Sequence, residues 1–193
     1  MVGDFDLQTP QSSSRHCERS EAIHEFQNHG LPRFARSDES KQPPPLLVLA
    51  WGNASRSDDA LGPLFIAALR EQLPPPLQHQ VEFLEDYQLQ IEHALDLVGR
   101  QNVLLVDASL SCPAPFQVTE LKAAQDSSLG SHALSPQALL QVYQDMQGEP
   151  PPPCTLLAIR GEKFELGEAP SPAALVHLAS AVSWARQWLL DAP

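Results

Sequence analysis

Apolar and polar residues follow two different periods along the chain from residue 46 onward. Short apolar runs bounded by turn residues predict strands at 46–52, 81–86, 102–107 and 155–160. Residues 116–122 alternate apolar and polar side chains, which predicts an edge strand with one exposed face. Apolar residues at helical spacing predict helices at 60–73, 90–98, 136–146 and 171–190. Strands that alternate with helices are typical of the α/β class. We expect a three-layer α/β/α sandwich, in which helices cover both faces of a mostly parallel, twisted sheet of about five strands.

Serine and proline mark several of the predicted helix ends. Ser135-Pro136 and Ser171-Pro172 each place an N-cap serine before a proline at the first helical position. The proline run 74–76 is expected to end the helix that begins at residue 60, because proline lacks the N–H that a helix interior uses.

The first 45 residues differ in composition from the rest of the chain. They are polar, lack a sustained apolar period and end in a polyproline stretch. We expect residues 1–45 to be a disordered or loosely attached extension and residues 46–193 to be the folded domain. The segment Arg15–Ile23 resembles translated bacterial intergenic repeats, which favours either a start of the native protein near Leu46 or Val48 or the insertion of a repeat upstream of the gene.

Charge and cysteine content exclude several classes of protein. The formal net charge of −12 argues against nucleic acid and anionic membrane surfaces as partners, because nothing supplies a basic stripe. The sequence has neither a run long enough to span a membrane nor an apolar signal-peptide core. The three cysteines are scattered and form no disulfide framework or metal knuckle, so we expect a reduced, cytoplasmic setting.

Candidate chemistry gathers where the predicted strands end. Gly52-Asn53 forms a turn after the first strand and leads to Asp58 and Asp59, while Asp107 ends the third strand. The carboxyl ends of parallel strands meet at one edge of the sheet, where open α/β folds bind ligands. His132 lies in a loop before the helix at 136 and could join them. Two carboxylates and an imidazole suit a divalent first-row metal.

Structural roles compete with this interpretation. Asp58 is more simply explained as a helix N-cap or a turn residue than as a ligand, and Asp59 could complement the helix dipole. Arg160, at the end of the last strand, could contact a substrate carboxylate or offset the local acids. The sequence lacks a dinucleotide loop, a phosphate loop, a serine-nucleophile elbow and a His-Glu-x-x-His helix.

These segments resemble a known family. Gly52–Pro63 resembles the Gly-Asn-x-x-x-x-Asp-(Asp/Glu)-x-x-Gly signature of nickel–iron hydrogenase maturation endopeptidases. Leu104–Ala108 resembles the family's second motif, and Ser131–Pro136 its histidine motif. Ile159–Gly167 is similar to the last strand and following loop of one branch. The resemblance extends from Leu46 to the C-terminus.

The resemblance implies a function and a set of site residues. Members of the family remove the C-terminal extension from a nickel-loaded precursor of the hydrogenase large subunit. By position, Asp59 and Asp107 would be catalytic, and Asp59, Asp107 and His132 would contact nickel supplied by the substrate. Some members place the histidine directly after a Ser-Pro pair; this chain has Gln137 there, so His132 is the candidate.

Two aspects of this function stay open. Nickel could polarise the scissile carbonyl or activate water, or it could serve only for recognition while a carboxylate acts as base. The same ligands would also serve a non-catalytic metal-sensing or chaperone-like module that docks on the precursor. A small-molecule hydrolase on a similar scaffold would need a deep pocket.

Overall fold

The computed structural model describes residues 42–125 and 134–192, and five strands of these residues form one sheet. The strands are β1 (Leu46–Trp51), β2 (Val81–Asp86), β3 (Asn102–Ser109), β4 (Phe116–Glu120) and β5 (Cys154–Arg160). Their order is β2-β1-β3-β5-β4, and all neighbours are parallel except β4, which pairs with β5 antiparallel. The edge strand expected from alternating residues is therefore β4.

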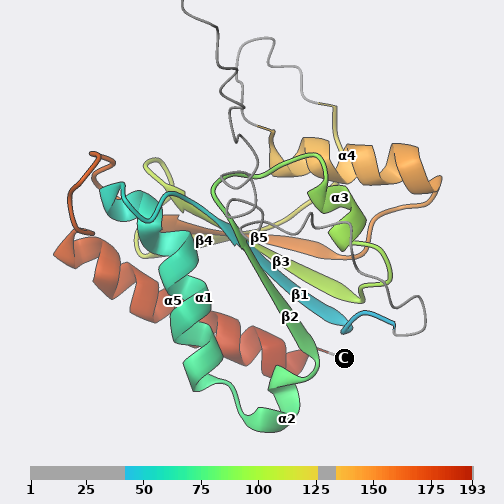
Figure 1. The fold of residues 1–193 in the computed structure, drawn as a ribbon, viewed down its shortest axis with the longest axis horizontal. Helices are drawn as coiled ribbons and strands as arrows, with labels where there is room; N and C mark the ends of the chain where they lie inside the picture. Colours follow the sequence, from blue (N-terminus) through green and yellow to red (C-terminus); the bar gives the residue numbers. More distant parts are fainter. Residues whose placement is uncertain (1–41, 126–133, 193) are drawn as a thin grey trace, which may run out of the picture. The chain divides into compact units, whose positions relative to one another are not determined.

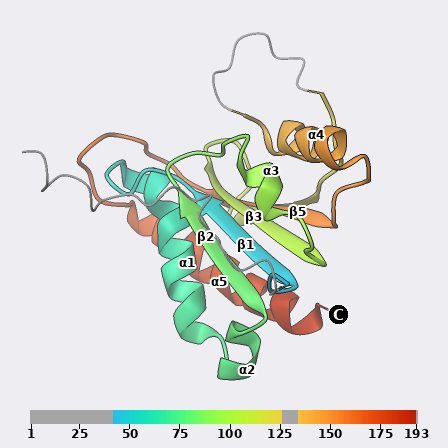
Figure 2. The same cartoon turned by 45° about the vertical axis from the view of Figure 1, so that its right-hand side comes forward.

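Helices cover both faces of this sheet (Figures 1 and 2). Helices α1 (Leu61–Gln72) and α5 (Pro172–Asp191) lie on one face, and α3 (His93–Asp96) and α4 (Pro136–Gln147) lie on the other. Neighbouring residues of β1 contribute to different cores: Val48 packs with α1 and α5, while Leu49 packs with α3 and α4. Successive side chains of a strand point to opposite faces, so a strand covered on both sides is apolar throughout. The expected three-layer sandwich is confirmed.

Both predicted serine caps are present. The Oγ atoms of Ser135 and Ser171 accept hydrogen bonds from the backbone N–H groups of Ala138 and Ala174, each at 3.2 Å. Each proline then occupies the first helical turn, where no N–H is needed. The N-terminal ends of α4 and α5 could therefore be predicted from the local sequence.

Two helices differ from the prediction. The helix expected at 90–98 is a single turn, α3, flanked by other turns. The proline run ends α1 as expected, but it also begins a further short helix, α2 (Pro75–Gln78), with Pro74 as its N-cap. Proline stops a preceding helix and favours the first turn of the next, so both effects come from the same residues.

The folded unit includes residues that the sequence placed in the extension. The carbonyl of Pro45 accepts hydrogen bonds from the backbone of Gln101 and Asn102, and the carbonyl of Pro44 accepts one from the side chain of the buried Arg100 at 2.8 Å. Contacts along the chain group Gln42–Pro193 as one unit. The polyproline stretch therefore packs against the turn before β3.

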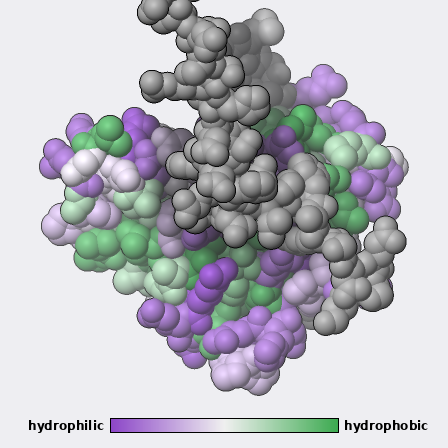
Figure 3. All heavy atoms as spheres, viewed as in Figure 1, coloured by the Kyte–Doolittle hydropathy of each residue, from purple (hydrophilic) through white to green (hydrophobic). Residues whose placement is uncertain are grey.

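The visible surface is mixed in character. Apolar and polar residues are interspersed on the face shown in Figure 3. Within the described parts of the chain, no helix has the length and apolar character needed to span a membrane.

Candidate functional site

The candidate site lies where the connections from the sheet diverge. β1 and β3 are neighbours, but the chain passes from β1 into α1 on one face and enters β3 from α3 on the other. Such a switch point leaves a crevice at the carboxyl ends of the two strands. Asp59 follows β1 and Asp107 lies near the end of β3, so the topology brings both carboxylates to this crevice.

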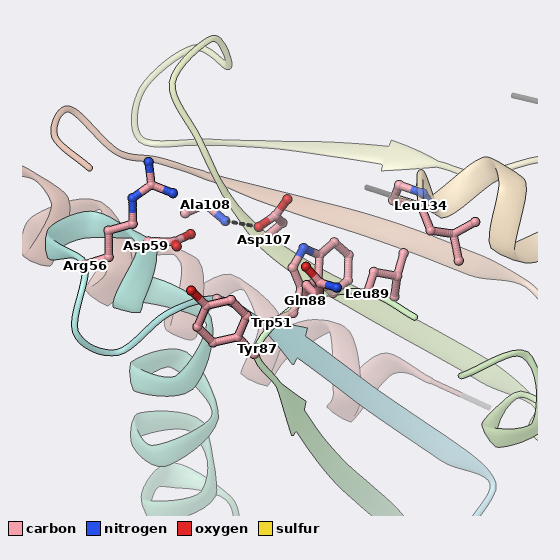
Figure 4. Close-up of a pocket in the computed structure, with 11 residues that line it drawn as sticks. Trp51, Arg56, Asp59, Tyr87, Gln88, Leu89, Asp107, Ala108 and Leu134 are labelled. Atoms are coloured by element: carbon pink, nitrogen blue, oxygen red, sulfur yellow. Dashed lines mark hydrogen bonds between the residues drawn. The ribbon is translucent and has the colours of Figure 1, made fainter. Parts of the chain in front are cut away.

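A pocket of about 350 Å³ occupies the crevice. Its lining combines acidic, aromatic and apolar side chains with one arginine (Figure 4): Trp51, Gly52, Arg56, Asp59, Tyr87, Gln88, Leu89, Asp107, Ala108, Leu134 and Pro136. The expected meeting of Asp59 and Asp107 is thus present in the described structure.

Two glycines let the turn after β1 fold back onto the strand. A Cβ on Gly52 would stand 2.0 Å from the carbonyl oxygen of Asp59, and one on Gly62 would stand 2.1 Å from that of Trp51. Gly52 also has a φ of +147°, which side chains disfavour. The spacing between these glycines therefore brings the 3₁₀ turn η1 (Ser57–Ala60) against the strand end and places Asp59 in the pocket.

Asp58 does not cap the helix, contrary to the expectation. Neither η1 nor α1 has a side-chain cap. Asp58 is instead 0% exposed and points into the β5–α5 loop. Its Oδ2 accepts hydrogen bonds from the backbone N–H groups of Glu162 and Lys163 and from Ser171 Oγ, and its Oδ1 accepts one from the backbone N–H of Ser171 at 2.6 Å. The N-cap explanation is wrong because distant donors bind this carboxylate.

Those hydrogen bonds decide the charge of Asp58. Burial opposes its ionisation, but the bonds from the backbone of Glu162, Ser171 and Lys163 outweigh burial and lower the pKa of the carboxyl below its ordinary value. Asp58 is therefore a buried, ionised anchor, and its neighbour Asp59 is left to face the pocket.

The rest of the turn is joined to the same loop. The backbone N–H and Oγ of Ser57 donate to the carbonyls of Glu168 and Ala169, each at 3.1 Å. The carbonyl of Ser55 accepts from the N–H of Gly167 at 2.8 Å, and Arg56 Nε donates to the carbonyl of Phe164 at 2.7 Å. Hydrogen bonds with the β5–α5 loop thus fix the position of the turn that carries Asp59.

Asp107 has an unusual proton affinity. Its burial raises its pKa to about 7; the nearby charge of Asp59 acts in the same direction, while hydrogen bonds from the Ala108 backbone and the Trp51 side chain act against it. A carboxyl that titrates near neutral pH can exchange protons during catalysis or release one when a cation binds.

Residues 87–89, which also line the pocket, belong to a hydrogen-bonded loop after β2. His93 is fully buried, and its Nδ1 accepts from the backbone N–H of Gln90 at 2.9 Å. Its proton therefore sits on Nε2, which lies 3.3 Å from Asp86 Oδ2. Tyr87 follows Asp86 in the sequence and is 63% exposed. Its hydroxyl accepts a hydrogen bond from Asn53 Nδ2. This network holds the pocket-lining residues 87–89.

The third expected ligand, His132, lies outside the described residues. Leu134, two positions later in the sequence, and Pro136 both line the pocket. Among residues 42–125 and 134–192, no group of three or more His, Cys, Asp or Glu side chains is placed to hold a metal. Asp59 and Asp107 therefore provide two oxygen donors, and a third ligand from the chain would have to come from elsewhere.

Other sequence candidates have structural roles. Arg160 Nη1 donates to the carbonyl of Cys112 at 3.0 Å, and this arginine is not among the pocket-lining residues. Asp86 supports His93 and the Tyr87 loop rather than lining the pocket. Sequence reasoning missed Arg56 and Tyr87. The position of Arg56, three residues before Asp59 in one tight turn, was the available signal for the first; nothing local indicated the second.

Comparison with known proteins identifies the fold. No protein-family model and no curated protein sequence matches the chain. Among solved structures, NiFe hydrogenase maturation protease HycI from Thermococcus kodakarensis KOD1 is similar with a TM-score of 0.61 and 18% identity, over 77% of this chain and 94% of that one. The hydrogenase maturating endopeptidase HybD from E. coli has a TM-score of 0.59 and 24% identity, over 76% and 92%. Hydrogenase 2 maturation peptidase from Thaumarchaeota archaeon SCGC_AB-539-E09 has a TM-score of 0.54 and 20% identity, over 75% and 97%.

The fold and the site together define an α/β protein with paired carboxylates at the switch point of its sheet. More particularly, the chain has the fold of the hydrogenase maturation proteases. This is the family whose motifs the sequence resembles.

Proposed function

We propose that this protein is an endopeptidase that removes the C-terminal extension of a nickel-loaded hydrogenase large-subunit precursor. The observation that carries the proposal is the meeting of Asp59 and Asp107 in one pocket. Each lies in a segment that resembles a motif of the maturation endopeptidases, and the chain has the fold of those enzymes.

The two carboxylates are the groups that would contact the metal. Carboxylate oxygens bind divalent first-row ions, and an imidazole from His132 would complete a set without thiolates. Such a set suits an ion that arrives with the precursor and leaves with the product, since it lacks the donors that hold nickel permanently. Nickel is thus part of the substrate in this proposal.

The chain's own residues supply proton transfer and position. Asp107, with a pKa raised to about 7, can accept a proton from the attacking water or release its own when the cation binds. Asp58 and the β5–α5 loop fix the turn that carries Asp59, so the second carboxylate is held in place before substrate arrives. Preorganised groups contribute to catalysis because they need not move in the transition state.

Purified components test the proposal. The protein is mixed with nickel-loaded precursor and, separately, with nickel-free precursor, and the mass of the large subunit is measured over time. We expect a shortened subunit only from the nickel-loaded precursor. Binding without shortening would contradict the peptidase activity and indicate a docking module instead.

A further inference from the structure

Arg56 supplies the positive charge among the described residues that line the pocket. We propose that Arg56 binds a carboxylate of the substrate polypeptide beside the Asp59–Asp107 pair, and so selects precursors with an acidic group near the scissile bond. This inference rests on the proposed function and deepens it, because it names a chemical feature of the substrate.

The side chain of Arg56 is held in place through its Nε atom. Its Nε donates to the carbonyl of Phe164 at 2.7 Å, in the β5–α5 loop. Its backbone is fixed as well, because its N–H donates to Asn53 and its carbonyl accepts from Asp59. Figure 4 shows the guanidinium beside Asp59, at the end of the pocket away from Leu134. With Nε occupied, the two Nη groups present the planar fork that pairs with a carboxylate through two hydrogen bonds.

Once a divalent ion from the substrate is bound, the charges of the pocket would favour an anionic group beside Arg56. Asp59 and Asp107 contribute two negative charges when both are ionised, and Arg56 contributes one positive charge. A divalent ion between the carboxylates would leave the pocket with a net positive charge. One carboxylate from the substrate would then balance it. Among residues 42–125 and 134–192, no ion pair joins Arg56 to Asp59 or Asp107; the neutral His93 lies against Asp86, and Arg100 pairs with Glu82.

A purely structural role for Arg56 makes a different prediction. If Arg56 only ties the turn to Phe164, then its loss should weaken cleavage of every precursor alike. If it binds a substrate carboxylate, then its loss should matter only for precursors that carry that carboxylate. A cycle that changes both partners separates the two roles.

The experiment measures kcat and KM with two altered nickel-loaded precursors. In one precursor the acidic side chains of the extension are changed to amides; in the other the terminal carboxylate is amidated. We expect Arg56→Gln to raise KM for the unaltered precursor about tenfold or more, with kcat changed less than about twofold. Arg56→Lys should recover part of the loss, since it keeps the charge without the fork. Arg186→Gln, an exposed arginine on α5, is the control and should match the wild type.

With wild-type protein, one of the two altered precursors should show the same rise in KM that Arg56→Gln causes with the unaltered precursor. Arg56→Gln should not raise KM for that altered precursor any further. Which precursor does so identifies the carboxylate as a side chain or the chain terminus. Equal losses of Arg56→Gln on all three precursors would overturn the inference.

Equilibrium binding of the same precursors separates this inference from the proposed function. Binding without cleavage by the wild type would contradict the peptidase proposal, and the binding cycle would still decide the role of Arg56. If the wild type neither bound nor cleaved the nickel-loaded precursor, both proposals would be contradicted.

Discussion

Asp107 is the residue whose chemistry is most changed by its surroundings. Because its pKa is raised to about 7, chiefly by burial, it is increasingly protonated below neutral pH and is then a poorer ligand and base. We expect kcat/KM for the nickel-loaded precursor to fall as the pH drops below about 7. The Trp51→Phe variant should move this fall to higher pH, since the Trp51 hydrogen bond lowers the pKa. A pH–rate profile of both proteins checks this, and identical profiles that are flat between pH 6 and 8 would contradict it.

The pKa of Asp58 is lowered, whereas that of Asp107 is raised, and Asp58 contributes to the stability of the fold. Asparagine caps helices nearly as well as aspartate, so the N-cap interpretation predicts a cost of only a few tenths of a kcal/mol for Asp58→Asn. The structure revises that expectation to about 2–4 kcal/mol, because a buried carboxylate with four donated hydrogen bonds is replaced by an amide that cannot accept them all.

The pH dependence of that loss has a definite sign. The pKa of Asp58 is lowered in the fold, so its stabilisation is present above the ordinary value of 3.8 and is lost as the pH falls through the lower folded value. Chemical denaturation at pH 7 and at acid pH should therefore show a difference from wild type that shrinks on acidification. Asp145→Asn, an exposed aspartate on α4, is the control. A cost of Asp58→Asn no larger than that of the control at pH 7 would contradict the anchor.

At the scale of an element, the turn between β1 and α1 depends on close backbone approach. Gly52→Ala would place a methyl group 2.0 Å from the carbonyl of Asp59, so the turn must move. We expect this variant to lose cleavage and to unfold several degrees earlier. Gly148→Ala is a matched control, because Gly148 also has a positive φ but no atom within 4 Å of an added Cβ. It should cost about 1–2 kcal/mol, because alanine disfavours a positive φ, and it should leave cleavage intact. Equal effects of the two variants in melting and cleavage would show that the close approach is unimportant.

The same elements show what sequence alone could establish. The strands and the Ser135 and Ser171 caps follow from local patterns, and the structure confirms them. The role of Asp58 could not be predicted, because its partners Glu162 and Ser171 lie more than a hundred positions away. The pocket position of Asp59 and Asp107 could be predicted, since parallel strands bring their carboxyl ends together. For Arg56, closeness to Asp59 in the sequence was the available signal, but the direction of its side chain depends on the conformation of the turn, which the sequence pattern does not determine.

At the scale of the whole molecule, the boundary of the fold is a testable feature. The polar composition of the first 45 residues and the start of the folded unit at Gln42 predict that deletion of residues 1–41 leaves the melting temperature unchanged. Deletion of residues 1–45 should destabilise the protein by about 2–3 kcal/mol, because the buried Arg100 loses the carbonyl of Pro44 and the turn before β3 loses that of Pro45. Thermal melting of both truncations against the full chain decides this. A large loss from the shorter deletion, or none from the longer one, would contradict the boundary.

Asp59 and Asp107 are the residues that we propose as the working site of a maturation endopeptidase. The most direct measurement is intact mass of nickel-loaded large-subunit precursor during incubation with wild-type protein, Asp59→Asn, Asp107→Asn and the control Asp145→Asn. We predict that the wild type and the control shorten the precursor once, at its C-terminus, while both site variants remain folded and lower the rate by at least about a hundredfold. Cleavage by folded Asp59→Asn and Asp107→Asn at the rate of the control would contradict the account.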